Sequence, residues 1–222
     1  ISLPSYEDES VLRDKIPSLK YFNLNHAVNE FTNAVFYVIR SKKTDDIHKA
    51  VKYGVWTSSP QNNNKIRDSF NQKSKTEGNV FFVFTYLGAS GFVGLARLVD
   101  VDLKREFPFW GEIGRWIGVM RLEWVYVRDV EFHNVLHLKE QSPMDKSYRP
   151  LSDLTDGTRL SDSSAKELVR IFNEKQEPSS VLKKFPGHDH QEQKLRHHVD
   201  EIIRSNTMES YKKQIQKKEE QR

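Results

Sequence analysis

Apolar residues are spread unevenly along the chain, and the densest run of them starts at residue 34. Residues 34–39 (AVFYVI) are all apolar, which is typical of a strand buried on both faces of a sheet. A helix is predicted next, because residues 44–46 (TDD) offer N-cap chemistry and the apolar residues after them keep helical spacing as far as Gly54. A short helix over 65–70 follows a polar, turn-rich segment.

The middle of the chain has the alternation and turn residues of antiparallel strands. The runs 80–87 and 92–99 are β-rich and are joined by a turn that contains two glycines, which predicts a hairpin. Residues 102–117 are predicted to form a loop, and 119–128 a strand with one alternating apolar face. A further strand is predicted over 132–138.

The two ends of the chain differ from its middle. Residues 1–20 have no sustained apolar period, so we expect a disordered or loosely ordered flank there. Residues 162–164 (DSS) cap a predicted helix, and beyond it the chain turns to Lys, Glu, Gln and His with a thin apolar stripe. We therefore predict one α/β domain over 21–178 and a polar C-terminal extension over 179–222, either a long helix or a frayed tail.

Composition narrows the classes of function. The 222 residues include no cysteine, which excludes a disulfide framework, cysteine-ligated zinc, iron–sulfur clusters and thiolate nucleophiles. No run approaches the roughly 18 apolar residues of a membrane span, and the first residues do not have the pattern of an export signal. We expect a soluble, unexported protein without a membrane partner, whose net charge of +4 permits an acidic one.

Motifs for catalysis are missing from the sequence. It has no glycine-rich phosphate loop after a strand, no G-x-S-x-G elbow and no H-E-x-x-H. The histidines at 188, 190, 197 and 198 look like a metal cluster, but they lie in the most polar part of the chain, so we expect a solvated helix there and no metal site. An enzyme would need a general base near the residues that bind its substrate. Close to the tryptophans discussed next, only Asp46 and His48 are candidates for that base.

The four tryptophans fall into two groups. Trp124 lies in an alternating strand and is expected in the core. Trp56, Trp110 and Trp116 lie at element ends or in loops, with polar or basic neighbours. Such a set favours one aromatic pocket with a basic rim. An RNA base would stack on the indole rings, and the rim would hold the phosphates. Core packing and a peptide pocket are the alternatives.

Several phrases of the sequence resemble the YTH domain, the module that recognises N6-methyladenosine in RNA, and are most similar to its fungal, budding-yeast-like members. The resemblance implies a mixed six-stranded, barrel-like β-sheet packed with helices. The matching phrases are FYVIRS at 36–41, DDIHKAVKYGVWTS at 45–58, NKIRDSF at 64–70, GFVGLARL at 91–98 and RWIGVMRLEWVYVRDV at 115–130.

By position, the resemblance implies a cage around the methylated base. Its walls are Trp56, Trp110 and Trp116. The base-edge contacts that it implies are Ser41, Lys42, Asp46 and Thr57. An ionised Asp46 and adenine N1 are both acceptors, so a direct bond needs a proton on one of them or a bridging water. A helix-capping role is the alternative for Asp46.

The same resemblance implies contacts with the RNA backbone, with one departure from the family. Where many members have an Arg-Asp pair, this chain has Thr155-Asp156, with Arg159 close by. A phosphate contact from that loop is therefore in doubt. The residues predicted at the RNA backbone are Arg40, Lys43, Arg97, Lys104, Arg115, Arg121, Asp156 and Arg159.

These expectations combine into a non-catalytic module without cofactor or metal. It is expected to be a monomer that binds single-stranded RNA containing N6-methyladenosine. The resemblance further implies a cytoplasmic role in messenger RNA decay, with decay factors recruited through the flanks. The alternative is a diverged domain that binds unmodified RNA or a peptide through another surface.

Overall fold

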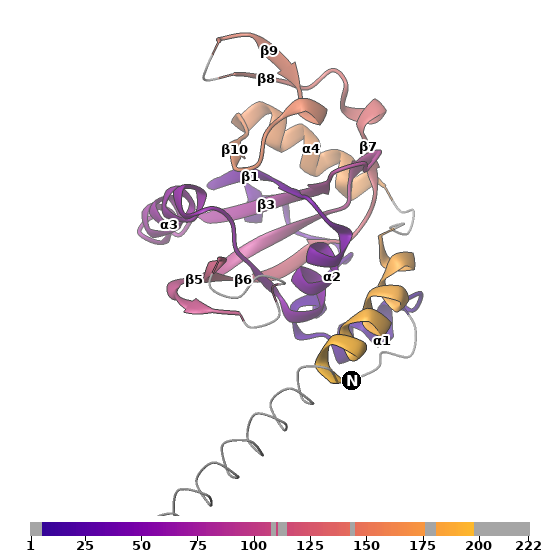
Figure 1. The fold of residues 1–222 in the computed structure, drawn as a ribbon. Coiled ribbons are helices and arrows are strands. Elements are labelled where there is room, and N and C mark those ends of the chain that lie inside the picture. The colour runs from indigo at the N-terminus through magenta and orange to yellow at the C-terminus, as the bar shows by residue number, and fades with distance from the viewer. Residues whose placement is uncertain (1–5, 108–109, 111–114, 143–144, 176–180, 198–222) are drawn as a thin grey trace, which may run out of the picture.

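A six-stranded sheet forms the centre of the molecule (Figure 1), and the computed structural model describes residues 6–107, 110, 115–142, 145–175 and 181–197. The strands lie in the order β10 (Thr158–Arg159), β1 (Ala34–Ser41), β3 (Asn79–Tyr86), β5 (Gly94–Glu106), β6 (Ile117–Tyr126) and β2 (Val55–Trp56). β1 and β3 are parallel, and the other neighbours are antiparallel. The predicted mixed six-stranded α/β fold is confirmed, although β10 and β2 are edges and leave the sheet open.

Helices and short strand pairs surround this sheet. The α-helices are α1 (Glu9–Lys15), α2 (Thr44–Tyr53), α3 (Pro60–Ser74), α4 (Asp162–Glu174) and a C-terminal helix of residues 185–197. The 3₁₀ turns are η1 (Pro17–Leu19), η2 (Val28–Phe31), η3 (Phe132–Val135), η4 (Leu151–Asp153) and η5 (Leu182–Lys184). The two-stranded pairs are β4 (Gly91–Phe92) with β7 (Val130–Glu131) and β8 (Lys139–Gln141) with β9 (Tyr148–Pro150). None of the described helices combines the length and apolar character that crossing a bilayer requires.

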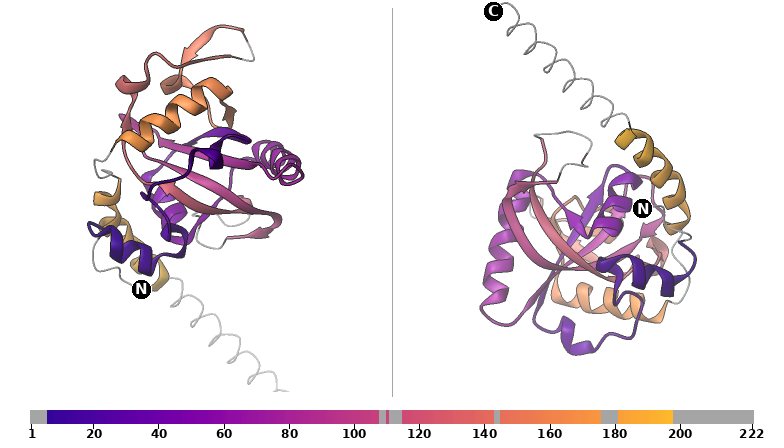
Figure 2. Two further views of the ribbon diagram at one scale, coloured as in Figure 1. Left: turned by 180° about the vertical axis from the view of Figure 1, so that it is seen from behind. Right: turned by 90° about the horizontal axis from the view of Figure 1, so that it is seen from below.

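Both faces of the sheet are covered, which explains the unbroken apolar run of β1. Phe36 and Val38 belong to a core with α4, whereas Tyr37 and Ile39 belong to a second core with α2, α1 and the segment before the C-terminal helix. Successive side chains of a strand point to opposite faces, so a strand between two cores needs apolar residues at every position. Figures 1 and 2 show α4 on one side of the sheet and α2 with the two terminal helices on the other.

The start of α2 differs from the prediction, while its end agrees. The N-cap is Lys43, without a side-chain cap hydrogen bond, so residues 44–46 form the first turn rather than the cap. Gly54 ends the helix with φ 61°. A Cβ at Gly54 would lie 2.7 Å from the Cβ of Ser18, so a side chain is excluded by both backbone and space. The glycine turns the chain directly into β2.

The N-terminal segment is packed, and its prediction as a disordered or loosely ordered flank is wrong for residues 6–20. Leu12, Leu19 and Phe22 are fully buried in the core that contains α2. Asp8 caps α1 by accepting hydrogen bonds from the backbone N–H groups of Ser10 and Val11. Leu12, Ile16 and Leu19 are spaced by four and three residues and all three are buried, so a short helical spacing was present in a segment that otherwise reads as polar. Residues 1–5 lie outside the described residues.

Three further boundaries differ from the sequence predictions. β5 continues through residues 102–106, which pair with β6 where a loop was predicted. The predicted strand 132–138 is instead the 3₁₀ turn η3 followed by an irregular segment. The helix predicted over 65–70 spans Pro60–Ser74, because Ser59 caps it and the proline occupies a first-turn position. The hairpin and the helix after 162–164 are confirmed.

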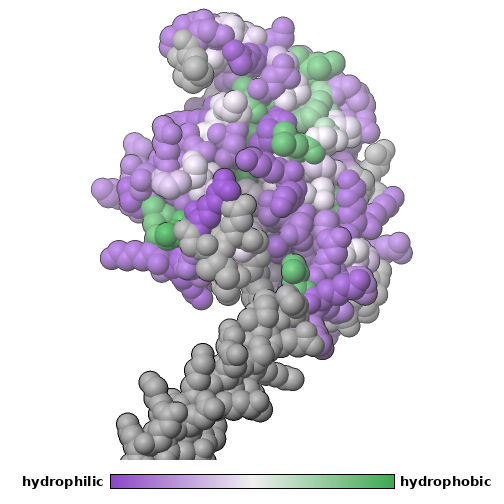
Figure 3. Space-filling model, viewed as in Figure 1, coloured by the Kyte–Doolittle hydropathy of each residue, from purple (hydrophilic) through white to green (hydrophobic). Residues whose placement is uncertain are grey.

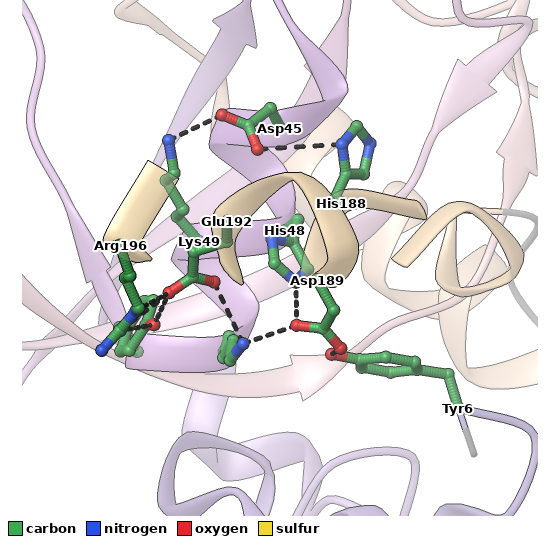
Figure 4. A network of polar contacts seen from close by, with 10 residues as sticks. Tyr6, Asp45, His48, Lys49, His188, Asp189, Glu192 and Arg196 are labelled. Carbon is green, nitrogen blue, oxygen red and sulfur yellow. Dashed lines mark hydrogen bonds and ion pairs between the residues drawn. The ribbon is translucent and has the colours of Figure 1, made fainter. Parts of the chain in front are cut away.

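A polar network fixes the C-terminal helix to α2 (Figure 4). The carboxylate of Asp189 accepts hydrogen bonds from Tyr6 Oη at 2.7 Å, His48 Nε2 at 3.0 Å and Lys52 Nζ at 2.5 Å. Glu192 lies 3.0 Å from Lys52 Nζ and also bonds Tyr53 and Arg196. The helix is therefore docked through charges, which is why its apolar stripe is thin. Residues 198–222 of the predicted extension lie outside the described residues.

Candidate functional site

A cavity of about 340 Å³ opens where β1 ends and α2 begins. It lies between the first turn of α2, the end of β2 and the segment that leads into β6. The lining residues are Arg40, Ser41, Lys42, Lys43, Asp45, Asp46, Trp56, Thr57, Ser58, Ser59, Trp110, Arg115, Trp116 and Asp156. The structure thus brings together the three predicted cage tryptophans and the four predicted base-edge residues.

The tryptophans meet nearly at right angles. The rings of Trp56 and Trp110 are 5.6 Å apart between centroids with an interplanar angle of 81°. Both are 6% exposed, while Trp116 is partly buried and packs against the same core. Two perpendicular walls and a third, more accessible ring suit a flat aromatic ligand that carries a small apolar substituent.

Each tryptophan owes its position to a neighbouring element. Trp56 pairs with Met120 across β2 and β6, and its ring contacts Phe84 edge-on at 5.2 Å. Trp110 contacts Phe107 at 5.5 Å. The Nε1 atoms of Trp56 and Trp110 are buried and have no hydrogen-bond partner among the described residues.

Trp124 provides the contrast that the sequence predicted. It is 2% exposed, belongs to the core on the α2 side of the sheet and does not line the cavity. Its Nε1 donates a hydrogen bond to the carbonyl oxygen of Ala50 at 3.1 Å. The indole is therefore fully satisfied within the protein, unlike those of the two buried cavity tryptophans.

A carboxyl group faces the cavity from the first turn of α2. Asp46 Oδ2 lies 3.0 Å from the hydroxyl of Ser41, which also lies 2.8 Å from the carbonyl of Lys43. Burial raises the pKa of Asp46, and the hydrogen bond from Ser41 opposes this only in part. The capping alternative for Asp46 is not supported, since α2 has no side-chain cap. A carboxyl with a raised pKa is suited to donate a hydrogen bond to an acceptor in the cavity.

The segment after Trp56 is held by one asparagine. Asn63 Nδ2 donates to Thr57 Oγ1 at 3.2 Å and to the carbonyl of Ile117 at 3.1 Å, and Asn63 Oδ1 accepts from the backbone N–H of Ser58 at 2.9 Å. Asn63 is 3% exposed. These bonds fix Thr57 between α3 and β6, beside the cavity.

Asp156 has three hydrogen-bond partners inside the protein. It accepts hydrogen bonds from the backbone N–H of Arg40 at 2.9 Å, Ser58 Oγ at 2.9 Å and Asn62 Nδ2 at 3.0 Å. A carboxylate also repels phosphate. These hydrogen bonds tie the end of β1 to the start of α3. Because Asp156 also lines the cavity, its contact with the RNA backbone stays a prediction.

The predicted RNA-backbone cations divide into two sets. Those that line the cavity are Arg40, Lys43 and Arg115, together with Lys42. Those that do not are Arg97, Lys104, Arg121 and Arg159.

Several of these arginines have partners within the protein. Arg97 pairs with Glu123, and Arg121 lies 3.4 Å from Asp100. The guanidinium of Arg40 donates to the carbonyls of Leu154 and Ser152, so its donors are partly used inside the protein.

Sequence reasoning missed three lining residues, Asp45, Ser58 and Ser59. Asp45 and Ser58 are adjacent in sequence to predicted residues and Ser59 is two positions from Thr57, and this proximity in sequence was the one signal for them. It also missed the partners of His48. His48 faces Asp189, away from the cavity lining, and burial lowers the pKa of His48.

Within the described part of the chain, one group of side chains has metal-ligand chemistry. Ligand atoms of His48, Asp189 and Glu192 lie within 4.8 Å of one another. The ammonium of Lys52 bonds both carboxylates and the guanidinium of Arg196 bonds Glu192, so the two negative charges are balanced without a metal ion. Of the predicted histidine cluster, His188 contacts Thr44 at 3.0 Å instead, and residue 198 lies outside the described residues.

Comparison with known proteins gives a consistent result. The family model for the YT521-B-like domain, called YTH, matches residues 34–173. The chain is 31% identical over 175 residues to the YTH domain-containing protein ECT3 of Arabidopsis thaliana, covering 75% of this chain and 34% of that protein. It is 24% identical over 204 residues to the YTH domain-containing family protein 1 of Mus musculus, covering 91% of this chain and 34% of that protein. The chain thus spans about a third of these relatives.

Solved structures share the fold. The YTH domain of the Zygosaccharomyces rouxii MRB1 protein, in complex with N6-methyladenosine RNA, aligns with a TM-score of 0.59 at 18% identity, covering 68% of this chain and 92% of that one. The Toxoplasma CPSF4 YTH domain with a 7-mer m6A-modified RNA aligns with a TM-score of 0.56 at 25% identity, covering 68% and 96%. With most of its sheet and its cavity inside the matched region, this chain belongs to the YTH domain family.

Proposed function

We propose that this domain binds single-stranded RNA at one N6-methyladenosine, without catalysing a reaction. The observation that carries the proposal is the convergence of Trp56, Trp110 and Trp116 on one cavity beside a buried carboxyl group. The complexes of related domains with N6-methyladenosine RNA support it. An unstacked base that enters the cavity would have aromatic walls on its faces and polar groups at its edge.

The methyl group is recognised by two effects of different size. Moving one methyl from water into an apolar pocket contributes about 0.8 kcal/mol, or roughly fourfold in affinity. The unmethylated amine has a second N–H, and leaving that donor unpaired against an indole costs about 1–3 kcal/mol. Together they predict a preference of roughly tenfold to several hundredfold for methylated RNA.

The charged rim supplies affinity without sequence information. Lys42, Lys43 and Arg115 line the same cavity as the tryptophans, so phosphates next to the captured base lie within their reach. Phosphate contacts of this kind release counterions and weaken as salt is added. The methyl preference resides in the cavity, and the salt-dependent affinity resides in the rim.

The wider role that we propose is the regulation of messenger RNA stability in the cytoplasm, with decay factors bound outside the domain and the domain itself monomeric. This part rests on the family resemblance alone. Transcript half-lives in cells with the intact protein and with a cavity variant would test it. Equal half-lives for methylated transcripts would contradict the role in decay without affecting RNA binding.

The test of binding uses two nine-nucleotide RNAs that differ by one N6-methyl group, followed by fluorescence anisotropy. The wild type is expected to prefer the methylated strand at least tenfold, and Trp116→Ala to lose most of that preference. Trp124→Phe is the matched control, because Trp124 lies in the core outside the cavity. Equal binding of both strands by the wild type would favour a domain for unmodified RNA, and binding of neither strand would favour a peptide ligand.

A further inference from the structure

We propose that the segment leading into the C-terminal helix extends the RNA-binding surface, and that Lys184 binds a phosphate of the strand leaving the cavity. The inference rests on the proposed function and adds a part of the surface to it. Its elements are Tyr86 and Lys184, beside Lys42 and Lys43 of the cavity rim.

The position of Tyr86 follows from the sheet. It is the last residue of β3 and is the register partner of Ser41, the last residue of the parallel strand β1. The backbone N–H of Leu87 donates to the carbonyl of Ser41 at 2.9 Å. Since Ser41 lines the cavity, Tyr86 lies next to the cavity, on the strand beside Ser41.

Lys184 reaches this edge from the far end of the chain. Its Nζ donates to the hydroxyl of Tyr86 at 2.9 Å and lies 5.0 Å from the centroid of that ring. One turn further on, His188 Nε2 lies 3.0 Å from Thr44 Oγ1, and Figure 4 shows His188 facing Asp45. Residues 184–188 therefore run alongside residues 41–44, of which 41–43 form one wall of the cavity.

The charges along this wall are unbalanced. Lys42, Lys43, Lys183 and Lys184 form no ion pair with any carboxylate in the described part of the chain. The two lysines of α2 itself are neutralised, Lys49 by Asp45 and Lys52 by Asp189. A row of unpaired ammonium groups beside a base-sized cavity fits the phosphates of a single strand.

The surface has the polarity that this partner requires. The face of the molecule in Figure 3 is mostly hydrophilic, with small, separate hydrophobic patches. Large exposed apolar patches are the mark of protein-docking surfaces. A polyanion is therefore favoured over an apolar peptide as the occupant.

The backbone at Lys184 is fixed by its neighbours. Val181, Leu182 and Phe185 are buried in the core that contains α2. Asp189 then anchors the following turn through its three hydrogen bonds. A cation on a preordered backbone loses less entropy when it binds phosphate than one on a loose tail.

The experiment compares Lys184→Glu with the wild type on two ligands, the N6-methyladenosine nucleoside and the methylated nine-nucleotide RNA. The nucleoside has no phosphate, so its affinity is expected to stay unchanged. The RNA is expected to bind roughly threefold or more weakly at low salt, with a salt slope flatter by about 0.7 for one lost phosphate contact on a single strand. Lys184→Arg is expected to bind like the wild type.

The matched control is Lys194→Glu, which makes the same charge change at an exposed position of the C-terminal helix that follows η5. Equal losses in Lys184→Glu and Lys194→Glu would contradict a local contact, as would an unchanged RNA affinity in Lys184→Glu. A loss of nucleoside binding would show instead that Lys184 supports the cavity. The methyl preference of the wild type is a separate readout, so failure of the proposed function is distinguishable from failure of the Lys184 contact.

Discussion

Trp56 has two roles that a substitution cannot separate. It lines the cavity, and it also packs edge-on against Phe84 beneath the sheet. We expect Trp56→Ala to remove the methyl preference and to lower the free energy of unfolding by about 3 kcal/mol, near the low end for loss of a buried tryptophan. Urea unfolding together with RNA binding would check both effects. A variant with full methyl preference would contradict the assignment of Trp56 to the cavity wall.

Asp46 is expected to control the pH dependence of binding. Burial raises the pKa of Asp46, so this carboxylate takes up a proton at a higher pH than an ordinary carboxylate does. The protonated carboxyl can then donate a hydrogen bond to adenine N1. We expect wild-type affinity for methylated RNA to rise as the pH falls from 7.5 toward the carboxyl range.

Asp46→Asn presents an amide donor at every pH. It is expected to bind methylated RNA more tightly than the wild type at pH 7.5, by roughly 1 kcal/mol or about fivefold for one gained hydrogen bond. Its affinity should also vary less with pH. Anisotropy titrations at three pH values would measure both, and weaker binding by Asp46→Asn would show that Asp46 acts as an acceptor.

The docking of the C-terminal helix depends mainly on the hydrogen bonds of Asp189, because the apolar stripe of this helix is thin. The carboxylate is 11% exposed and has three donors on α2 and the N-terminal segment. Removing one partner of a buried charged network leaves the others unpaired. We expect Asp189→Ala to lower the free energy of unfolding by about 3 kcal/mol.

A surface variant provides the comparison for Asp189→Ala. Glu174→Ala breaks an exposed ion pair with Arg170, and exposed pairs contribute at most about 1 kcal/mol. Chemical unfolding of both variants would measure the difference. Equal effects would mean that the C-terminal helix is held by its apolar residues alone.

The same interface predicts how stability changes with pH. Burial lowers the pKa of His48, and Asp189 opposes this only in part. The unfolded chain therefore binds a proton at His48 near pH 6.5, before the folded protein does. Stability is expected to fall as the pH decreases from 7.5 through 6.5.

His48→Gln isolates that contribution. The pKa values of Asp189 and Glu192 are lowered, Glu192 to about 2 because hydrogen bonds from Tyr53, Arg196 and Lys52 outweigh burial. Their contributions change only below about pH 5. The unfolding free energy of His48→Gln should thus vary less than that of the wild type between pH 7.5 and 5.5, and an identical variation would contradict the assignment.

The elements that the sequence predicted well have local signals. β1 shows as an unbroken apolar run, Gly54 as a helix end, and the hairpin as two β-rich runs around a glycine turn. The packed N-terminal segment and the docked C-terminal helix were missed because their partners lie far away in sequence. Asp189 meets His48 across 141 positions, and no periodicity reports such a contact.

The candidate site was predicted to a similar extent. The three tryptophans stood out because each has polar or glycine neighbours, and the resemblance supplied their common role. The internal partners of Asp156 and of Arg97 could not be predicted, because the residue type alone does not tell whether a charged side chain contacts phosphate or a neighbouring side chain. Three-dimensional pairing decides between the two.

At the scale of the whole molecule, the two proposed sources of binding energy respond differently to salt. The contacts between rim cations and phosphates weaken as salt increases, whichever RNA is bound. The logarithm of the binding constant falls against the logarithm of the salt concentration with a slope of about 0.7 per phosphate contact on a single strand. The indole walls make neutral contacts with the base, which salt leaves almost unchanged. Affinity and preference should therefore separate when salt is varied.

The most direct test measures the dissociation constants of the methylated and unmethylated nine-nucleotide RNAs at 50 and 200 mM salt. Two to four phosphate contacts predict that both constants rise by roughly sevenfold to fiftyfold over this range. Their ratio should stay at roughly tenfold or more in favour of the methylated strand. A ratio near one at both salt concentrations would contradict the account, because the tryptophan-lined cavity would then not distinguish the methyl group.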